Sequence, residues 1–226
     1  MKSLLISGIN GKVGSHLLRL SKKYQLNVVC GVDRKTFCEA DCPVYTDFSQ
    51  VKERVDVIID FSSPALCEQA LDFAFKERCV FISGTTALLA NQKAKLKELS
   101  TKVAVCHANN FSKNVIHFTQ AATVLKNSLE EFDCILIEEH NKLKKDAPSG
   151  TAKKIANELS ISQVFPIRGG NISGLHKIIF LGDGEEIEIT HRAYEKSVFA
   201  KGALYCANRL LQKEKGLYTI EQLINE

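Results

Sequence analysis

The 226-residue sequence predicts an α/β fold in two parts: a doubly wound parallel sheet, then a smaller α+β domain with an open mixed sheet. Over about the first hundred residues, short apolar runs alternate with amphipathic segments, as in sheets covered by helices on both faces. After Ser112 a long amphipathic segment and two adjacent strand patterns replace this alternation. We therefore expect one domain over residues 1–112, with 197–226 packing back on it, and a second over 113–196.

The elements of the first part follow in a regular order. "SLLISG" is a short apolar run that ends in glycine, which is typical of a buried parallel strand. The next segment, "KVGSHLLRLSKKY", places Val13, Leu17, Leu20 and Tyr24 on one helical face. The remaining elements alternate in the same way: strands over 26–32, 55–63, 79–83 and 102–108, and helices over 64–77 and 88–99.

The second part has a different pattern. A helix over 114–129 precedes the strand "CILIEEH" and a helix from Thr151. "GLHKIIFLG" and "EEIEITHRA" are two strand patterns joined by the turn "GDGE", which predicts a hairpin. The last stretch, over 200–224, reads as helical and is expected to pack on the first domain.

Composition excludes several classes of protein. Hydrophobic residues make up 45% and charged residues 25%, and the net charge of +4 is too small to indicate nucleic-acid binding. Most of the eight cysteines lie in apolar runs, and Cys38 and Cys42 alone do not form the paired clusters of a zinc site, so we expect reduced thiols and no metal. No signal peptide or transmembrane run is evident, and we expect a cytoplasmic protein.

Three glycines lie directly between the first strand and the first helix. Gly8, Gly11 and Gly14 form G-x-x-G-x-x-G, and Asp33 lies 19 positions beyond Gly14 at the end of the second strand. The glycines alone also suit an ordinary tight turn. In this context they predict a Rossmann-like dinucleotide site, where backbone N–H groups meet the pyrophosphate and the carboxylate accepts from ribose hydroxyls. Because the cation Arg34 follows Asp33, we expect NADH or NADPH without strong preference.

Polar groups also follow two later strands, at the sheet edge where such folds bind ligands. "DFSSP" comes after the third strand and "SGTTA" after the fourth. Gly84, Thr85 and Thr86 would suit the nicotinamide side of a cofactor. The alternative interpretation is ordinary helix capping and turn formation.

A third set of polar residues lies between the strand "CILIEEH" and the following helix. Residues 148–151, "PSGT", form the helix entry, whose N–H and hydroxyl groups can bind a carboxylate. Lys144 and Lys145 lie beside it and His140 ends the strand. Such a cationic site suits a small dicarboxylate, although a capped helix with solvated lysines is the simpler alternative.

Beyond these local patterns, the sequence resembles a known family. "GINGKVG", "DFSSP", "GTT", "NNFS", "EEHNKLKKDAPSGTA", "RGGNISGLH", "EITHRA" and "FAKGAL" follow the order found in 4-hydroxy-tetrahydrodipicolinate reductases, the dihydrodipicolinate reductases of lysine and diaminopimelate biosynthesis. The resemblance spans essentially the whole chain. Its most specific segment is H-x-x-x-K-x-D-A-P-S-G-T.

The resemblance implies a role for each matching residue. His140 resembles the family's catalytic proton donor, and Lys144 its catalytic lysine, which also holds a substrate carboxylate. The implied substrate-binding residues are Asn141, Lys144, Ser149, Gly150 and Thr151. The implied cofactor-binding residues are Gly8, Asn10, Gly11, Lys12, Val13, Gly14, Asp33, Arg34, Phe61, Ser62, Gly84, Thr85, Thr86, Asn110, Phe111 and Ser112.

The resemblance also implies a reaction and an assembly. A nicotinamide cofactor would deliver hydride to C4 of the cyclic substrate after loss of water, and members are commonly homotetramers joined through their C-terminal sheets. Three positions depart from the family pattern. Asn141 replaces a second histidine, Ala87 stands where glycine is common, and Lys196 where arginine is common.

Two other functions remain open at this stage. A non-catalytic NAD(P)-binding regulator could use the same fold, but it would not need His140 and Lys144 at a helix entry. Another aspartate-pathway reductase would require a thiolate nucleophile or a different acid–base set, and no cysteine lies in an obviously electropositive loop.

Overall fold

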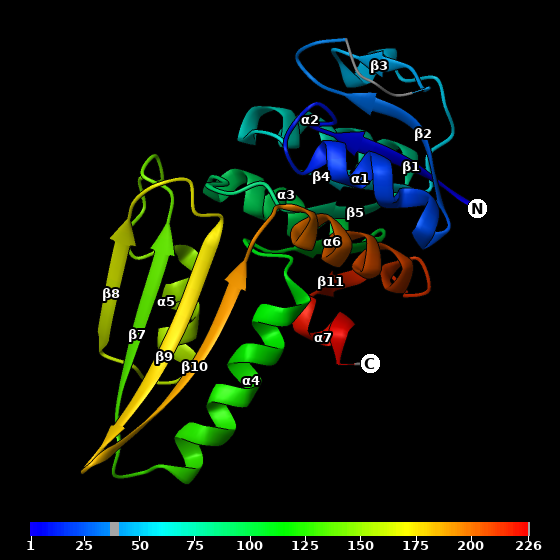
Figure 1. Ribbon diagram of the computed structural model, residues 1–226. Coiled ribbons are helices and arrows are strands. Elements are labelled where there is room, and N and C mark those ends of the chain that lie inside the picture. Colours follow the sequence, from blue (N-terminus) through cyan, green and yellow to red (C-terminus); the bar gives the residue numbers. More distant parts are fainter. Residues whose placement is uncertain (37–40, 226) are drawn as a thin grey trace. The chain divides into compact units, whose positions relative to one another are not determined.

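The computed structural model describes residues 1–36 and 41–225. They form two compact units (Figure 1). The first runs from Met1 to Phe111 and continues from Ser197 onward, and the second runs from Ser112 to Lys196. Cys38 lies outside the described residues. The expectation of reduced thiols can therefore be compared with the structure only at the other cysteines.

The first unit is built on a parallel sheet. In the described part of the chain it has seven strands, in the order β11-β6-β5-β4-β1-β2-β3, and every pair is parallel. The carboxyl ends of the inner strands therefore meet at one edge, which is where open sheets of this kind bind ligands. The strands are β1 (Lys2–Ser7), β2 (Leu26–Val32), β3 (Val44–Tyr45), β4 (Val57–Asp60), β5 (Val80–Ser83), β6 (Ala104–His107) and β11 (Gly216–Tyr218).

Helices cover both faces of this sheet. One pair of helices, α1 and α6, packs together, and α2 and α3 form another pair. Pro64 starts α2, where its missing N–H costs nothing, and the Ser63 hydroxyl caps the helix by accepting from the Leu66 N–H. The helices are α1 (Gly14–Leu20), α2 (Pro64–Glu77), α3 (Ala90–Ser100), α6 (Ser197–Leu210) and α7 (Ile220–Ile224), with short 3₁₀ turns at Ser21–Tyr24 and Phe48–Gln50.

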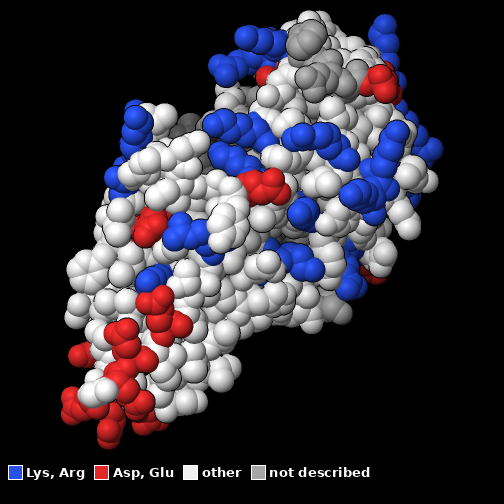
Figure 2. Space-filling model, viewed as in Figure 1, with Lys and Arg blue, Asp and Glu red and all other residues white. Residues whose placement is uncertain are grey.

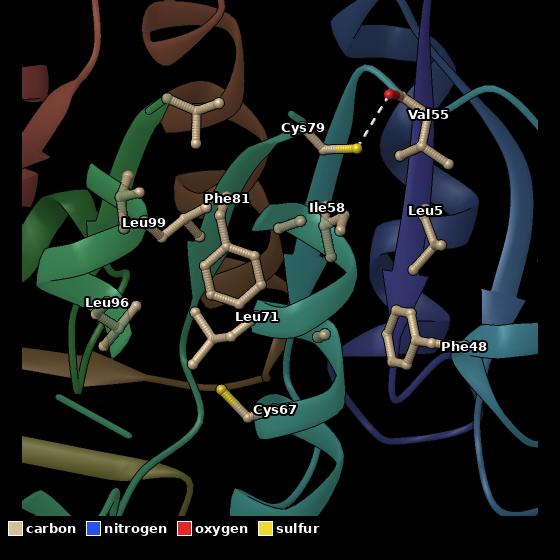
Figure 3. Close-up of a cluster of buried hydrophobic side chains, with 14 of the residues drawn as sticks. Leu5, Phe48, Val55, Ile58, Cys67, Leu71, Cys79, Phe81, Leu96 and Leu99 are labelled. Atoms are coloured by element: carbon tan, nitrogen blue, oxygen red, sulfur yellow. Dashed lines mark hydrogen bonds between the residues drawn. The ribbon is translucent and has the colours of Figure 1, made fainter. Parts of the chain in front are cut away.

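A cluster of buried apolar side chains joins α2 and α3 to the sheet (Figure 3). Leu5, Ile58 and Phe81 come from three neighbouring strands, and Leu71 and Leu96 from the two helices. All five side chains are at most 3% exposed, so their burial is a main source of this unit's stability.

The second unit has a mixed sheet in the order β10-β9-β7-β8. The strands β9 and β10 form an antiparallel hairpin, β7 is antiparallel to β9, and β8 is parallel to β7. One face carries α5, so Leu136 and Ile178 are fully buried against Ile155. The elements are α4 (Lys113–Ser128), β7 (Asp133–His140), α5 (Gly150–Glu158), β8 (Gln163–Arg168), β9 (Gly174–Gly182) and β10 (Glu185–Ala193).

The predicted fold class is confirmed, but three strands were missed. The final stretch is not one helical segment, because β11 pairs with β6 between α6 and α7. β3 has only two residues, and β8 carries Pro166, which is tolerated because β8 is an edge strand. Very short or proline-containing strands lack the apolar pattern from which strands are predicted.

Acidic residues gather at one end of the second unit's sheet (Figure 2). Asp183, Glu185 and Glu186 lie at the β9–β10 turn, and the β7 residue Asp133 pairs in register with Leu181 beside it. This end of the sheet would repel an anionic ligand.

No helix in the described chain has the length and apolar character needed to span a membrane.

Candidate active site

The glycine turn after β1 is closely packed. Gly8 has φ +79°, and a Cβ there would lie 2.5 Å from the Phe61 carbonyl oxygen. A Cβ on Gly14 would lie 2.1 Å from the Gly8 carbonyl oxygen, so α1 can begin this near to the turn only without a side chain. Val13 precedes α1 without a side-chain cap. The turn therefore fits a dinucleotide pyrophosphate, which needs glycines and backbone donors at this position.

Asp33 closes this turn from the end of β2. Its carboxylate accepts hydrogen bonds from the Asn10 N–H at 2.9 Å and from the Arg34 N–H at 2.7 Å. The Asn10 side chain donates to the Lys35 carbonyl at 2.8 Å. The predicted ribose-binding carboxylate and the glycine turn are therefore joined into one structure, with the Arg34 side chain exposed beside it.

A buried carboxylate, which the sequence interpretation did not single out, organises the neighbouring strand ends. Asp60 is fully buried and accepts hydrogen bonds from the hydroxyls of Ser62, Ser83 and Thr85. The Thr85 hydroxyl also accepts from the Ser62 N–H at 3.0 Å, and the Thr85 backbone N–H donates to the Ser83 hydroxyl. Thr85 is thus engaged in holding the loops, whereas Thr86 is exposed at the same edge.

Aromatic packing brings the other predicted residues of the first unit together. A Cβ on Gly84 would meet the Phe61 ring at 2.2 Å, and Phe61 lies edge-on to Phe111 with ring centroids 5.6 Å apart. Phe111 is 1% exposed, so it supports the loops from inside. Lys12 is exposed, and Asn110 is partly exposed. Ser112 is the buried first residue of the second unit, at the start of α4.

In the second unit, strand register brings four ionisable side chains together. Glu138 and His140 alternate on β7, so they share one face of the sheet. Glu138 pairs with His176 on β9, and His140 pairs with Arg168 on β8. These four residues lie at the end of the sheet away from the acidic turn.

Glu138 is the buried centre of this group. Its Oε1 accepts from the Arg168 guanidinium at 2.6 Å and from the Ser149 N–H at 2.8 Å, and its Oε2 lies 3.4 Å from His140 Nε2. Burial alone would raise the pKa of Glu138, but the nearby His140 ring and the hydrogen bonds from Ser149 and Arg168 hold it well below its usual range. Glu138 is therefore a carboxylate with one oxygen facing His140.

His176 closes the group on the other side. Its ring lies edge-on to that of His140, with centroids 5.8 Å apart, and its side chain is nearly fully buried. Burial lowers the pKa of His176 to about 4, and electrostatic interactions with His140, His191 and Lys144 add to the shift, although Glu138 opposes it. His176 is thus a neutral imidazole at physiological pH.

The loop after β7 is folded by Asn141. Its side-chain oxygen accepts from the Leu143 N–H at 3.0 Å, and its carbonyl accepts from the Lys144 N–H at 3.1 Å. Asparagine makes such a turn readily, so the residue that replaces the family's second histidine shapes the loop that presents Lys144. Lys144 is partly buried, and Lys145 is exposed.

The donors predicted to bind a substrate carboxylate already hold one from the chain itself. Lys144 Nζ lies 2.7 Å from Asp146 Oδ1. Burial alone would raise the pKa of Asp146, but the Lys144 ammonium and a hydrogen bond from the Gly150 backbone hold it below its usual range. Lys144 and the start of α5 therefore both interact with the Asp146 carboxylate.

The start of α5 is capped by Ser149. The Ser149 hydroxyl accepts from the Ala152 N–H at 3.2 Å, and the residue is 2% exposed. Thr151 is partly exposed in the first turn. The helix entry is thus anchored to β7 through the hydrogen bond that the Ser149 N–H donates to Glu138.

Glu138, His140 and His176 also offer ligand atoms within 4.8 Å of one another, as a metal site would. However, the Arg168 guanidinium is bonded to the same carboxylate at 2.6 Å, and a divalent cation would have to lie beside it. These three side chains are therefore better suited to sharing a proton than to binding a metal ion. That no metal is needed stays a prediction.

Glu138, Arg168 and His176 were not predicted from the sequence as site residues. Glu138 could have been found, because it lies two residues before His140 and so shares its strand face. Arg168 and His176 lie in "RGGNISGLH", well separated in sequence, and only the pairing of β8 and β9 with β7 brings them to the site.

The fold and the site place the protein in the class of two-domain proteins that bind a dinucleotide on a Rossmann-like sheet. One unit is a Rossmann-like sheet with a dinucleotide-type glycine turn, and the other presents a histidine and a carboxylate-holding lysine on a mixed sheet.

Comparison with known proteins narrows this class to one family. Residues 2–111 match the family described as "Dihydrodipicolinate reductase, N-terminus", and residues 114–224 match "Dihydrodipicolinate reductase, C-terminus". The chain belongs to the dihydrodipicolinate reductase family.

Individual relatives agree over their full length. The 4-hydroxy-tetrahydrodipicolinate reductase of Caldanaerobacter subterraneus subsp. tengcongensis is 35% identical, covering 100% of this chain and 99% of its own. That of Thermosipho africanus is 34% identical, covering 98% and 97%. Among solved structures, the dipicolinate-bound dihydrodipicolinate reductase from Paenisporosarcina sp. TG-14 superposes with a TM-score of 0.81 at 21% identity, over 97% of both chains, and shares the fold.

Proposed function

We propose that the protein is a 4-hydroxy-tetrahydrodipicolinate reductase that uses NADH or NADPH. It would convert 4-hydroxy-tetrahydrodipicolinate to tetrahydrodipicolinate in lysine and diaminopimelate biosynthesis, consuming one proton and releasing one water. The observation that carries the proposal is the carboxylate site at Lys144 and the start of α5, with His140 on the adjoining strand. The full-length relatives named for this activity support it.

Each part of the second unit has a role in this proposal. Lys144, the Gly150 backbone and Thr151 would bind one substrate carboxylate in place of Asp146. His140 would supply the proton as the substrate is reduced, which as general acid catalysis is worth about 10²–10⁴ in rate. Asn141 would position Lys144 and line the site, and Ser149 would hold the helix entry.

The first unit would bind the cofactor, whose nicotinamide supplies the hydride. The turn over residues 8–14, with Asn10, Lys12 and Val13, would hold the pyrophosphate, and Asp33 and Arg34 the adenosine ribose. The loops after β4, β5 and β6 would line the nicotinamide end, through Phe61, Ser62, Gly84, Thr86, Asn110 and the buried supports Thr85 and Phe111. Because both Asp33 and Arg34 are in place, we expect both cofactors to work.

A reductase that uses a thiolate nucleophile has less support. Cys30, Cys67, Cys79, Cys106 and Cys206 are buried. Burial, for example, raises the pKa of the Cys79 thiol to about 12, so this group stays a thiol at physiological pH. A non-catalytic regulator is also disfavoured, because cofactor binding would not require His140 and Lys144 in their observed positions.

The open face of the second sheet supports a homo-oligomer. Phe165, Ile167 and Leu181 are 49%, 47% and 38% exposed there, and exposed apolar side chains that share one sheet face suit contact with another subunit. We expect a tetramer joined through this face. Light scattering at micromolar concentration tests this, and a monomer would contradict it. The cytoplasmic location expected from the sequence stays a prediction.

Oxidation of the cofactor tests the proposed activity. Freshly generated 4-hydroxy-tetrahydrodipicolinate is mixed with the protein, and the loss of NADH or NADPH absorbance is followed. We expect oxidation with both cofactors. No oxidation with either would refute the proposed function.

A further inference from the structure

The hydrogen bonding around His140 distinguishes its two ring nitrogens. Nε2 is buried and makes no hydrogen bond, and it lies 3.4 Å from Glu138 Oε2, which is also buried and unpaired. Nδ1 is not among the buried unpaired atoms, and the His140 side chain is 14% exposed. Nε2 is therefore the buried nitrogen beside the carboxylate, which leaves Nδ1 as the nitrogen available to a substrate.

Glu138 is itself held in place. Its other oxygen, Oε1, is bonded to Arg168 and to the Ser149 N–H, so the carboxylate cannot rotate without breaking two hydrogen bonds. Arg168 is also fixed, because it donates to the Ile167 and Asp146 carbonyls. This leaves Oε2 as an acceptor aimed at His140, in an environment where an unpaired carboxylate oxygen is costly.

The other neighbours of His140 leave Oε2 as the acceptor for Nε2. His176 approaches ring edge to ring face, and its own nitrogens make no hydrogen bond. Gly174 lies beside the ring, where a Cβ would be 3.0 Å from Cε1 and 3.5 Å from Nδ1, so a side chain there would push the imidazole away. The charged groups around the histidine pair are Glu138, Arg168, Lys144 and Asp146, with the imidazole of His191 beyond His176.

We propose that Glu138 is a positioning residue that keeps the proton of His140 on Nε2, so that Nδ1 is the nitrogen that delivers the proton to the substrate. The cationic ring carries Nε2–H toward Glu138 and Nδ1–H toward the substrate. When hydride supplied by a bound cofactor reduces the substrate at C4, the Nδ1–H bond would break. Its proton would go to the substrate atom that gains electron density, and His140 would remain as the neutral Nε2–H tautomer. In other enzymes, too, a buried acid orients a catalytic imidazole and fixes its tautomer.

This inference rests on the proposed function for its kinetic part, but its tautomer part does not. The tautomer is read in the ligand-free protein by NMR of ¹⁵N-labelled histidine, at a pH where the ring is neutral. Couplings between the carbon-bound ring protons and the two ring nitrogens distinguish Nε2–H from Nδ1–H. The His140 signals are those that disappear in His140→Gln. We expect Nε2–H for His140. An Nδ1–H tautomer in the wild-type protein would overturn the inference.

Kinetics give the second test. Glu138→Gln keeps the shape of the side chain and its acceptor for the Ser149 N–H but removes the charge. We expect kcat to fall about 10- to 100-fold, as for other residues that orient a functional histidine, with substrate KM changed less than about threefold. The matched control is Glu131→Gln, which removes an exposed carboxylate just before β7 and should leave kcat unchanged.

The outcomes separate the two proposals. A kcat of Glu138→Gln equal to wild type would overturn the positioning role, and so would a loss confined to KM. If Glu138→Gln does not fold, the wild-type tautomer still decides. Absence of wild-type activity would refute the proposed function, while the tautomer measurement would still report on Glu138.

Discussion

Replacing His176 should change how stability depends on pH. The folded-state pKa of His176 is about 4, against 6.5 for a free histidine, because the ring is buried beside His140. As the pH falls below 6.5, the unfolded chain takes up a proton that the folded chain does not, so unfolding becomes easier until about pH 4. At about 1.4 kcal/mol per pKa unit, the loss is about 3 kcal/mol, of which about 2 kcal/mol falls between pH 7 and pH 5.

The measurement is urea unfolding, followed by circular dichroism at pH 7, 6 and 5, at one fixed protein concentration. His176→Gln keeps a similar volume but cannot titrate. It should lose about 2 kcal/mol less than wild type over this range, whatever its stability at pH 7. The control is Ile178→Val, which lies on the same strand and should cost about 0.5–1.5 kcal/mol equally at each pH. Equal losses in wild type and His176→Gln would refute the reasoning.

Three further substitutions test separate features of the first unit. Arg34→Ala should raise the KM for NADPH about tenfold and that for NADH less than twofold, and an equal rise for both would mean that Arg34 does not contact the 2′-phosphate. Ala87→Gly should raise the free energy of unfolding by about 0.5–1 kcal/mol, or Tm by about 1–3 °C, because Ala87 has φ +60°; a lower Tm would show that this strain is absent. Gly202→Ala should lower the free energy of unfolding by at least about 3 kcal/mol, since its Cβ would lie 1.6 Å from the Phe111 carbonyl oxygen. The control is Gly169→Ala, whose Cβ would meet nothing within 4 Å. Equal stability of both variants would be inconsistent with this packing.

The sequence predicted the parallel sheet well because its strands are short apolar runs bounded by glycine and polar residues. β1 and β4 have this pattern, and β1 from Leu4 onward and all of β4 are buried. The glycine turn was predictable for a similar reason, since only glycine suits Gly8 and Gly14. Edge strands such as β8 depend on pairing with a neighbour, which no local pattern records.

The site was predictable in part. Lys144 and the helix entry form a local motif, so their proximity follows from the chain itself. Glu138 and Asp60 are buried acids with partners that lie far along the chain, and burial of an acid is decided by the partners that satisfy it. The structure also gives Asn141 a role in the loop that its comparison with histidine did not suggest.

Steady-state kinetics on His140→Ala, Lys144→Ala and Lys145→Ala test the catalytic assignment most directly. The two lysines are neighbours, but Lys144 is paired with Asp146 at the start of α5 whereas Lys145 is exposed. We predict that the first two variants lose turnover by about 10²-fold or more. NADH affinity, measured separately, should stay intact, and Lys145→Ala should remain close to wild type. Full turnover in both His140→Ala and Lys144→Ala would contradict the assignment, and equal losses in the two lysine variants would show that the wrong lysine was chosen.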